Sequence, residues 1–168
     1  YAALDAATTG NDNVAIGQAA LSNATTASNN TAVGRLALNA NTTASQNTAI
    51  GVQALGLAQT ANSNTALGYR AGYACTTGYN NVFVGLNSGD SSTTGHSNVF
   101  VGQSAGQSLT TATECIIIGN NAGAALTTGG QNIIIGDNAA AGAAVTGNSN
   151  TIVGDNAGYT LTSGAANV

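Results

Sequence analysis

The feature that most constrains the fold is a five-residue box that ends in glycine and returns along the whole chain. Seven of the eight spacings between successive box glycines are identical, and the last is longer by a single position. A sequence this periodic predicts a stack of near-identical units, each contacting only its neighbours. The box glycines are Gly17, Gly34, Gly51, Gly68, Gly85, Gly102, Gly119, Gly136 and Gly154.

Three further columns, each formed by the residues at one position of the repeat, recur with the same period. The period is therefore not a chance similarity of short segments. Asparagine opens the boxes, alanine follows three residues after the glycine, and threonine precedes the asparagine by four, as in Ala20 and Thr26. Disordered low-complexity chains lack such regularly placed β-branched residues. The asparagine column is Asn13, Asn30, Asn47, Asn64, Asn81, Asn98, Asn132 and Asn150, with Cys115 replacing it once.

Each 17-residue unit is interpreted as one coil of a parallel β-solenoid. The unit is too short for a helical hairpin repeat, whose periods start at about 33 residues. The box holds three consecutive β-branched or small apolar residues and then glycine, which is typical of a short strand and its end. We therefore expect an all-β fold of about ten coils in one domain, 1–168. The repeats start at 13, 30, 47, 64, 81, 98, 115, 132 and 150, with partial coils at 1–12 and 167–168.

Stacking gives each column an expected role. The asparagines would form a ladder of amides bonded from coil to coil, and the box glycines would adopt backbone angles that other residues avoid. Side chains alternate along a strand, so the second and fourth box positions face one way and the third faces the other. The fourth position is always Ile, Val or Leu, which predicts that it lies in the core.

The third box position drifts from Ala through Phe to Ile along the chain, and like follows like. An outward face in water usually turns polar, so this drift predicts a lateral interface covered by another chain. The alternative is a flat solenoid in which both faces belong to one monomeric core. The predicted interface residues are Phe83, Phe100, Ile117, Ile134 and Ile152.

The boxes also carry a family resemblance. "NVAIG" at 13–17, "NTAVG" at 30–34, "NTAIG" at 47–51 and "NTALG" at 64–68 resemble the head repeats of trimeric autotransporter adhesins. "TTGYNNVFVG" at 76–85 and "TTGHSNVFVG" at 93–102 are similar to repeats of phage tail fibres and bacterial surface fibres. The resemblance implies a β-roll or solenoid, often trimeric, in a fibre that is extracellular, on a cell surface or on a virion.

Composition removes several classes of partner. Charged residues make up 5% of the chain, against about a quarter in a typical soluble domain. Arg35 and Arg70 are the only strong cations, too few for nucleic-acid binding. No basic amphipathic helix and no apolar run of ~18 residues is visible, so no membrane association is expected.

The reactive side chains do not form a known catalytic or metal-binding pattern. His96 is the only histidine. Asp137 and Asp155 occupy the same position of the repeat, and they are interpreted either as two solvated turn residues or as a weak cation site. Cys75 and Cys115 lie in different columns, which predicts buried thiols rather than a disulfide or zinc site. Left-handed β-helix acyltransferases need three hexapeptides per coil and a catalytic histidine, and this unit has one hexapeptide. We expect no enzymatic activity, cofactor or metal.

The sequence therefore predicts a structural protein whose partner is another copy of itself, in a lateral trimer or an end-to-end filament. Tyr1 and Val168 both fall inside a coil, which indicates either an excerpt of a longer fibre or an axial contact. Glycans are expected at Asn23, Asn29 and Asn41 if the chain is exported, because each opens an N-x-[ST] motif.

The alternative function is ice binding through ranks of threonine. Adjacent threonines in a strand face opposite ways, so each "TT" pair supplies one outward rank. The column is Thr9, Thr26, Thr43, Thr60, Thr77, Thr94, Thr111, Thr128 and Thr146.

Overall fold

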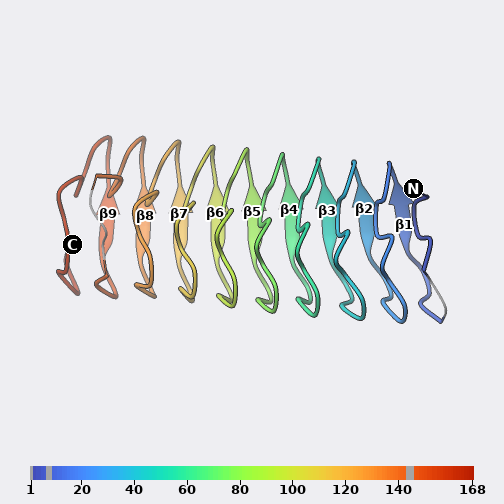
Figure 1. Ribbon diagram of the computed structural model, residues 1–168. Helices are drawn as coiled ribbons and strands as arrows, with labels where there is room; N and C mark the ends of the chain where they lie inside the picture. The colour runs from blue at the N-terminus through green and yellow to red at the C-terminus, as the bar shows by residue number, and fades with distance from the viewer. Residues whose placement is uncertain (1, 7–8, 143–145) are drawn as a thin grey trace.

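The computed structural model is a stack of coils that forms an elongated rod (Figure 1), and it describes residues 2–6, 9–142 and 146–168. One three-residue strand recurs in each coil, and no helix occurs among the described residues. The strands are β1 (Val14–Ile16), β2 (Thr31–Val33), β3 (Thr48–Ile50), β4 (Thr65–Leu67), β5 (Val82–Val84), β6 (Val99–Val101), β7 (Ile116–Ile118), β8 (Ile133–Ile135) and β9 (Thr151–Val153).

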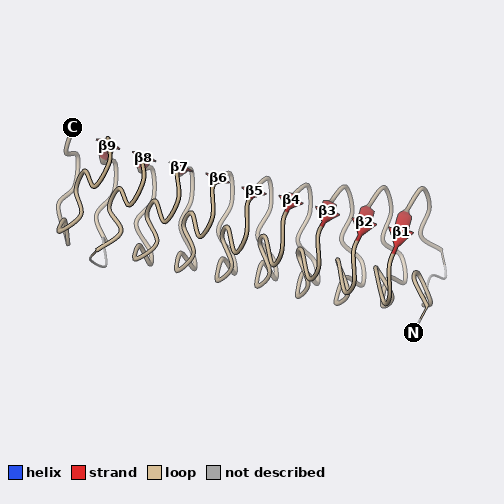
Figure 2. Ribbon diagram, turned by 90° about the horizontal axis from the view of Figure 1, so that it is seen from above, coloured by secondary structure: helices blue, strands red, loops and turns tan. Residues whose placement is uncertain are grey.

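Each strand pairs in parallel with the next, so the nine strands form one sheet in chain order. The pairing register equals the repeat, as in Thr31 opposite Thr48, and it lengthens by a single position only between β8 and β9, where Ile133 pairs with Thr151. Figure 2 shows the strands along one side of the rod and turns closing the rest of each coil. At about 4.8 Å per coil, β1 and β9 lie about 38 Å apart.

The predicted all-β parallel solenoid with one strand per repeat is confirmed. Nine strands enclose eight complete turns, and the expected count of about ten coils included the partial turns at 1–12 and after β9.

The third box position faces the interior, which corrects the prediction of a lateral interface there. Phe83, Phe100, Ile117 and Ile134 are 0% exposed within the single chain, and Ile152 is 7% exposed. The fourth box position faces outward, which also corrects the prediction that it lies in the core. Strand side chains alternate, so a coil that encloses the third position must expose the second and fourth.

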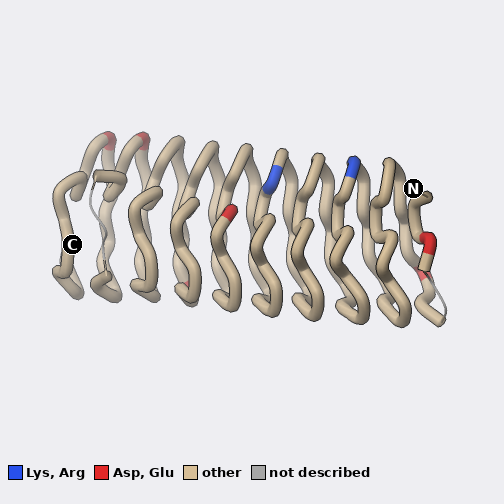
Figure 3. Tube along the Cα trace, viewed as in Figure 1, with Lys and Arg blue, Asp and Glu red and all other residues tan. Residues whose placement is uncertain are grey.

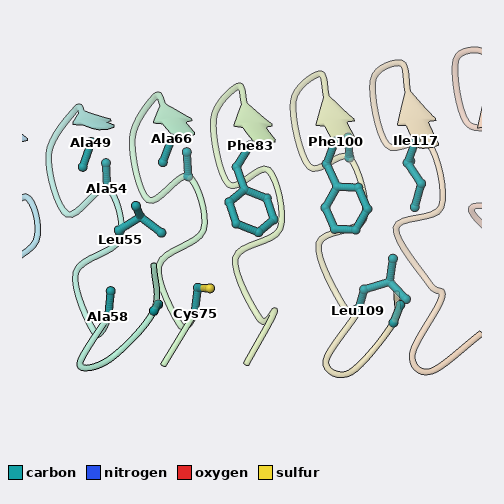
Figure 4. Close-up of a cluster of buried hydrophobic side chains, with 14 of the residues drawn as sticks. Ala49, Ala54, Leu55, Ala58, Ala66, Cys75, Phe83, Phe100, Leu109 and Ile117 are labelled. Atoms are coloured by element: carbon teal, nitrogen blue, oxygen red, sulfur yellow. The ribbon is translucent and has the colours of Figure 1, made fainter. Parts of the chain in front are cut away.

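The interior is filled from two sides. In the early coils the strands contribute alanine, and leucines four residues after the box glycine fill the space from the turn wall. In the later coils the strands contribute Phe or Ile, and glycine or alanine takes the place of those leucines. Figure 4 shows Phe83 and Phe100 pointing from their strands into the interior, with Leu55 entering it in an earlier coil.

The box glycines fit the tightest corner of each coil. Their φ angles lie between 124° and 141°, a region that side chains rarely adopt. A Cβ built on Gly51 would collide with the carbonyl oxygen of Gly68 in the next coil. The glycine column therefore sets both the turn and the close approach of neighbouring coils.

Candidate functional site

The most continuous surface feature is the outward side of the sheet, which we call the outer strand face. It consists of the second and fourth box positions of all nine strands, and every side chain is Val, Ile, Leu or Thr. Ile16 is 59% exposed, Leu67 48% and Val153 63%, so large apolar groups lie open to solvent. The fourth-position column is Ile16, Val33, Ile50, Leu67, Val84, Val101, Ile118, Ile135 and Val153.

The in-register pairing makes this face a set of straight columns. Val82 lies opposite Val99 and Val84 opposite Val101, and the same alignment continues in both directions. Parallel sheets normally have both faces covered and so carry apolar residues on both. Here one face encloses the core, and the other has no covering within the described part of the chain.

A second column borders the outer strand face, formed by the first residue after each box glycine. We call it the flank column. Its charged members are Arg35 in the coil of β2, Asp137 in that of β8 and Asp155 in that of β9. Along the upper edge of the rod in Figure 3, positive charges lie in the N-terminal half and negative charges lie toward the C-terminal end.

The asparagine column forms a buried ladder of hydrogen bonds through the rod. Asn81 donates from its backbone N to Asn64 Oδ1 at 2.9 Å and from Nδ2 to the same oxygen at 3.0 Å. Its Nδ2 also donates to the carbonyl oxygen of Gly95 at 2.9 Å. Members from Asn30 to Asn150 are at most 1% exposed, so the ladder satisfies polar groups that water cannot reach.

Cys115 continues the ladder with a thiol. Its backbone N donates to Asn98 Oδ1 at 2.9 Å, and its Sγ lies 3.4 Å from the carbonyl oxygen of Gly129. The backbone N of Asn132 donates to Sγ at 3.5 Å. Burial raises the pKa of this thiol, and the hydrogen bonds only partly oppose that shift.

Cys75 packs in the core of the coil of β4. Burial raises its pKa to about 12, and its Sγ lies 3.6 Å from the carbonyl oxygen of Gly78. Both cysteines are free and buried, which confirms the prediction of two buried thiols. A neutral, inaccessible thiol is a poor nucleophile, so neither cysteine is placed for chemistry.

Asp137 and His96, which the sequence singled out, each contact neutral neighbours. Asp137 accepts hydrogen bonds from the amides of Asn120 at 3.0 Å and Asn138 at 3.2 Å. His96 stacks on Tyr79 with ring centroids 4.6 Å apart. Within the described residues, no three His, Cys, Asp or Glu side chains lie close enough together to hold a metal ion.

One ion pair was missed by sequence reasoning. Arg70 donates from Nε and Nη2 to the two carboxylate oxygens of Asp90 at 2.9 and 3.1 Å. Its guanidinium carbon also lies 4.2 Å from the ring centroid of Tyr73. The separation of Arg70 and Asp90 along the chain is not a multiple of the repeat, so they belong to different columns and the period gives no signal for them.

The threonine column forms one exposed rank along the rod. Thr60, Thr77 and Thr94 are exposed, as are the other members. The preceding threonines are used within the stack: Thr93 donates from Oγ1 to the carbonyl oxygen of Thr110 at 3.0 Å. The first threonines of five "TT" pairs thus link coils through their hydroxyls, while the second threonines form the outward rank; the linking residues are Thr25, Thr42, Thr76, Thr93 and Thr110.

The other predicted surface sites are only partly available. Asn23 and Asn29 are exposed, but Asn41 is 0% exposed and its amide bonds to the backbone of Ala44. The prediction of a glycan on Asn41 is therefore wrong for the folded chain, because its side chain fills the interior. Val168 is exposed, while Tyr1 lies outside the described residues.

One open hollow of about 400 Å³ lies beside the early coils and is bordered by Gln18, Arg35 and Asn39, and another of about 400 Å³ lies beside β9. Asn39 donates its amide to Ser22 Oγ and the carbonyl oxygen of Ala19, so it is already engaged. No helix in the described part of the chain could cross a membrane.

No protein-family model, characterised protein or solved structure matches this chain. The resemblance to adhesin and tail-fibre repeats therefore rests on the sequence boxes alone.

Proposed function

We propose that this chain is a structural, non-enzymatic repeat protein that builds an extracellular fibre or filament by packing against copies of itself. The observation that carries the proposal is the outer strand face. Nine strands about 4.8 Å apart and three residues wide give an apolar strip of roughly 400 Å². The largest apolar patch of a typical monomer is about 300–600 Å², and such a patch is often a functional surface.

The charge distribution supports self-packing. The chain has two arginines and no lysine, and no charged side chain lies on the outer strand face. Little electrostatic repulsion therefore opposes contact between copies. The low lysine and arginine content also leaves few sites for trypsin-like proteases, which suits an extracellular location.

The mode of assembly includes lateral contact, end-to-end stacking of coils, or both, as in the tail-fibre, adhesin-shaft or filament roles that the sequence resemblance implies. Lateral contact is assigned to the outer strand face rather than to the third box position. Substituting Ile117 or Ile134 with Asp would place a charge in the core and unfold the rod, so it cannot test an interface.

The decisive experiment measures assembly of the purified chain by sedimentation velocity and electron microscopy over a concentration series. The double variant Val84→Asp/Ile118→Asp changes two outward residues, and Thr94→Asp/Thr111→Asp is the matched control on the exposed threonine rank. We expect the first to abolish assembly with little change in melting temperature and the second to assemble normally. A wild-type chain that stays monomeric throughout would contradict the proposal.

Ice binding is the second candidate function, favoured by the exposure of every threonine in the rank at the coil spacing. A thermal-hysteresis measurement on the wild type tests it, with Thr60→Lys/Thr77→Lys as the disrupting variant. Absence of hysteresis in the wild type rejects this candidate. Thermal hysteresis that is present in the wild type and lost in the variant would establish ice binding in place of the fibre proposal.

A further inference from the structure

The outer strand face and its flank column together match the size of a protein interface. Five extended residues span about 16 Å, and the chain bends at the box glycine, so the strip with its flank column covers at most roughly 700 Å² over nine coils. A stable dimer of standard size buries about 800 Å² on each partner. A second copy of the same chain therefore presents a surface of matching extent and apolar character.

The rod axis of the second copy can run antiparallel or parallel to that of the first, and the charges of the flank column distinguish these two orientations. β5 is the middle strand, so a two-fold axis through β5 along the strand direction brings β2 of one copy opposite β8 of the other. The same operation keeps the two flank columns on the same side. Arg35 of each copy then faces Asp137 of the other, and Asp155 lies one coil away.

None of these three charges forms an ion pair among the described residues. The only salt bridge among the described residues joins Arg70 to Asp90. Arg35 is exposed, and Asp137 and Asp155 accept hydrogen bonds from neutral asparagine amides. With the two rod axes parallel, the flank columns lie on opposite margins of the interface and Arg35 meets no carboxylate of the flank column.

We propose that two copies pack face to face through the outer strand face with antiparallel axes, about a two-fold axis through β5. Arg35 of each copy pairs with Asp137 of the other. The apolar columns supply the affinity, and the two rim charge pairs fix the direction, since peripheral charges contribute more to specificity than to affinity. This inference rests on the proposed self-packing function and adds the partner's orientation.

Cysteine cross-linking tests the orientation. In the proposed dimer Val84 of β5 faces its own counterpart across the two-fold axis, whereas Val33 of β2 would lie about 29 Å along the rod from its counterpart, six coils away. Facing sheets stand ~10 Å apart, which is too far for a disulfide, so a bismaleimide of about 10 Å reach is used. The native thiols are buried, and wild-type protein with the reagent is the control.

We expect cross-linked dimers from Val84→Cys, none from Val33→Cys alone, and dimers from a mixture of Val33→Cys and Ile135→Cys. Dimers from Val33→Cys alone would establish parallel axes and overturn the proposal. Absence of dimers from Val84→Cys would overturn it as well. If assembly persists in either of these cases, the fibre proposal stands without the antiparallel pair; if no assembly occurs at all, both fail.

A charge exchange tests the pairing independently. Arg35→Asp should weaken dimerisation roughly fivefold, because two exposed ion pairs become repulsive contacts. Adding Asp137→Arg should restore the wild-type dissociation constant measured by sedimentation. Equally weak dimerisation of the single and double variants would contradict the assigned contact between Arg35 and Asp137.

Discussion

The coils of β1 to β4 and those of β5 to β9 share one backbone path but fill it with opposite sets of side chains. In the first group, the strands contribute alanine and the turn wall contributes leucine as far as the coil of β3. In the second, the strands contribute Phe or Ile and the turn wall contributes glycine or alanine. The wall column is Leu21, Leu38 and Leu55, then Gly72, Gly89, Gly106, Gly123, Ala140 and Gly158.

The wall position is left-handed in both groups, so the choice of residue has a conformational cost. Leu38 has φ 49° and Leu55 has φ 48°, whereas Gly89 has φ 59°. A non-glycine residue in this region costs about 1–2 kcal/mol. Burying a leucine side chain contributes about 1.5–3 kcal/mol, so the early coils offset the strain by burial. The later coils avoid most of the strain and fill the interior from the strand.

The junction shows that the two arrangements exclude each other. The coil of β4 has Ala66 in the strand and Gly72 in the wall, and the ring of Phe83 from the next coil occupies the space. A Cβ on Gly72 would collide with that ring and lie 3.0 Å from Leu55 Cδ2. Volume is therefore shared between neighbouring coils, not balanced within each one.

The largest effect is expected from Gly89→Leu, which imposes the early wall residue on a late coil. Its Cβ would collide with Phe83 and lie 3.1 Å from Phe100 Cδ2. Overpacking costs about 1–3 kcal/mol, and the left-handed backbone adds about 1–2 kcal/mol for a non-glycine residue. Adding Phe83→Ala should recover about 1–3 kcal/mol of that loss in a double-mutant cycle measured by urea unfolding. Simple additivity of the two substitutions would show that these positions do not share the space.

The sequence predicted the fold because the constant period, the box and the glycine stop each indicate a stacked strand. It also predicted the asparagine ladder, since a buried amide at a constant register has its counterpart one coil away. The inward face could not be assigned from the strand alone. Four boxes have threonine at the second position, but that position shares its face with the fourth, which is always Val, Ile or Leu. Alternation along the box therefore gave no consistent sign of which face was enclosed.

The missing signal lay in another column. The change from Leu55 to Gly72 in the wall accompanies the change from Ala66 to Phe83 in the strand. Such compensation indicates two positions that fill one interior, and it would have assigned the third box position to the core. The Arg70–Asp90 pair had no comparable signal, because its offset differs from the repeat and depends on turn geometry.

The asparagine ladder is a second difference between the early and the later coils, because it is continuous as far as the coil of β6 and is interrupted at Cys115. Asn64→Ala should therefore cost about 3 kcal/mol. It leaves the carbonyl oxygen of Gly78 and the amide groups of Asn81 without their side-chain partner in a buried site. Thermal unfolding against Gln59→Ala, an exposed neutral control, checks this. A loss no larger than that of the control would mean that water replaces the ladder.

Cys115→Asn is the converse substitution, because it makes the later half resemble the earlier one. The new amide would donate to the carbonyl oxygen of Gly129 and accept from Asn132, replacing weak thiol contacts. The expected gain is about 1 kcal/mol, seen as a higher melting temperature. A lower one would show that this coil needs the smaller and less polar thiol.

The last comparison concerns Cys75, which shares one interior position of the repeat with Ala58 of the early coils and Leu109 of the later ones. Burial raises its pKa from 9.0 to about 12. The folded chain therefore holds this proton more tightly than the unfolded chain. The resulting stability is fully present below pH 9 and is lost as the pH rises from 9 toward 12.

At pH 10 this loss should reach about 1.4 kcal/mol, since each pH unit in the window changes the free energy of unfolding by ~1.4 kcal/mol. Cys75→Ala, which copies the early-coil residue Ala58, removes the contribution. Urea unfolding at pH 8 and pH 10 should therefore show a smaller pH-dependent loss in the variant than in the wild type, with tyrosine titration common to both. Equal losses would mean that the junction opens to water, and that the two packing arrangements meet less tightly than the contacts of Phe83 and Gly72 imply.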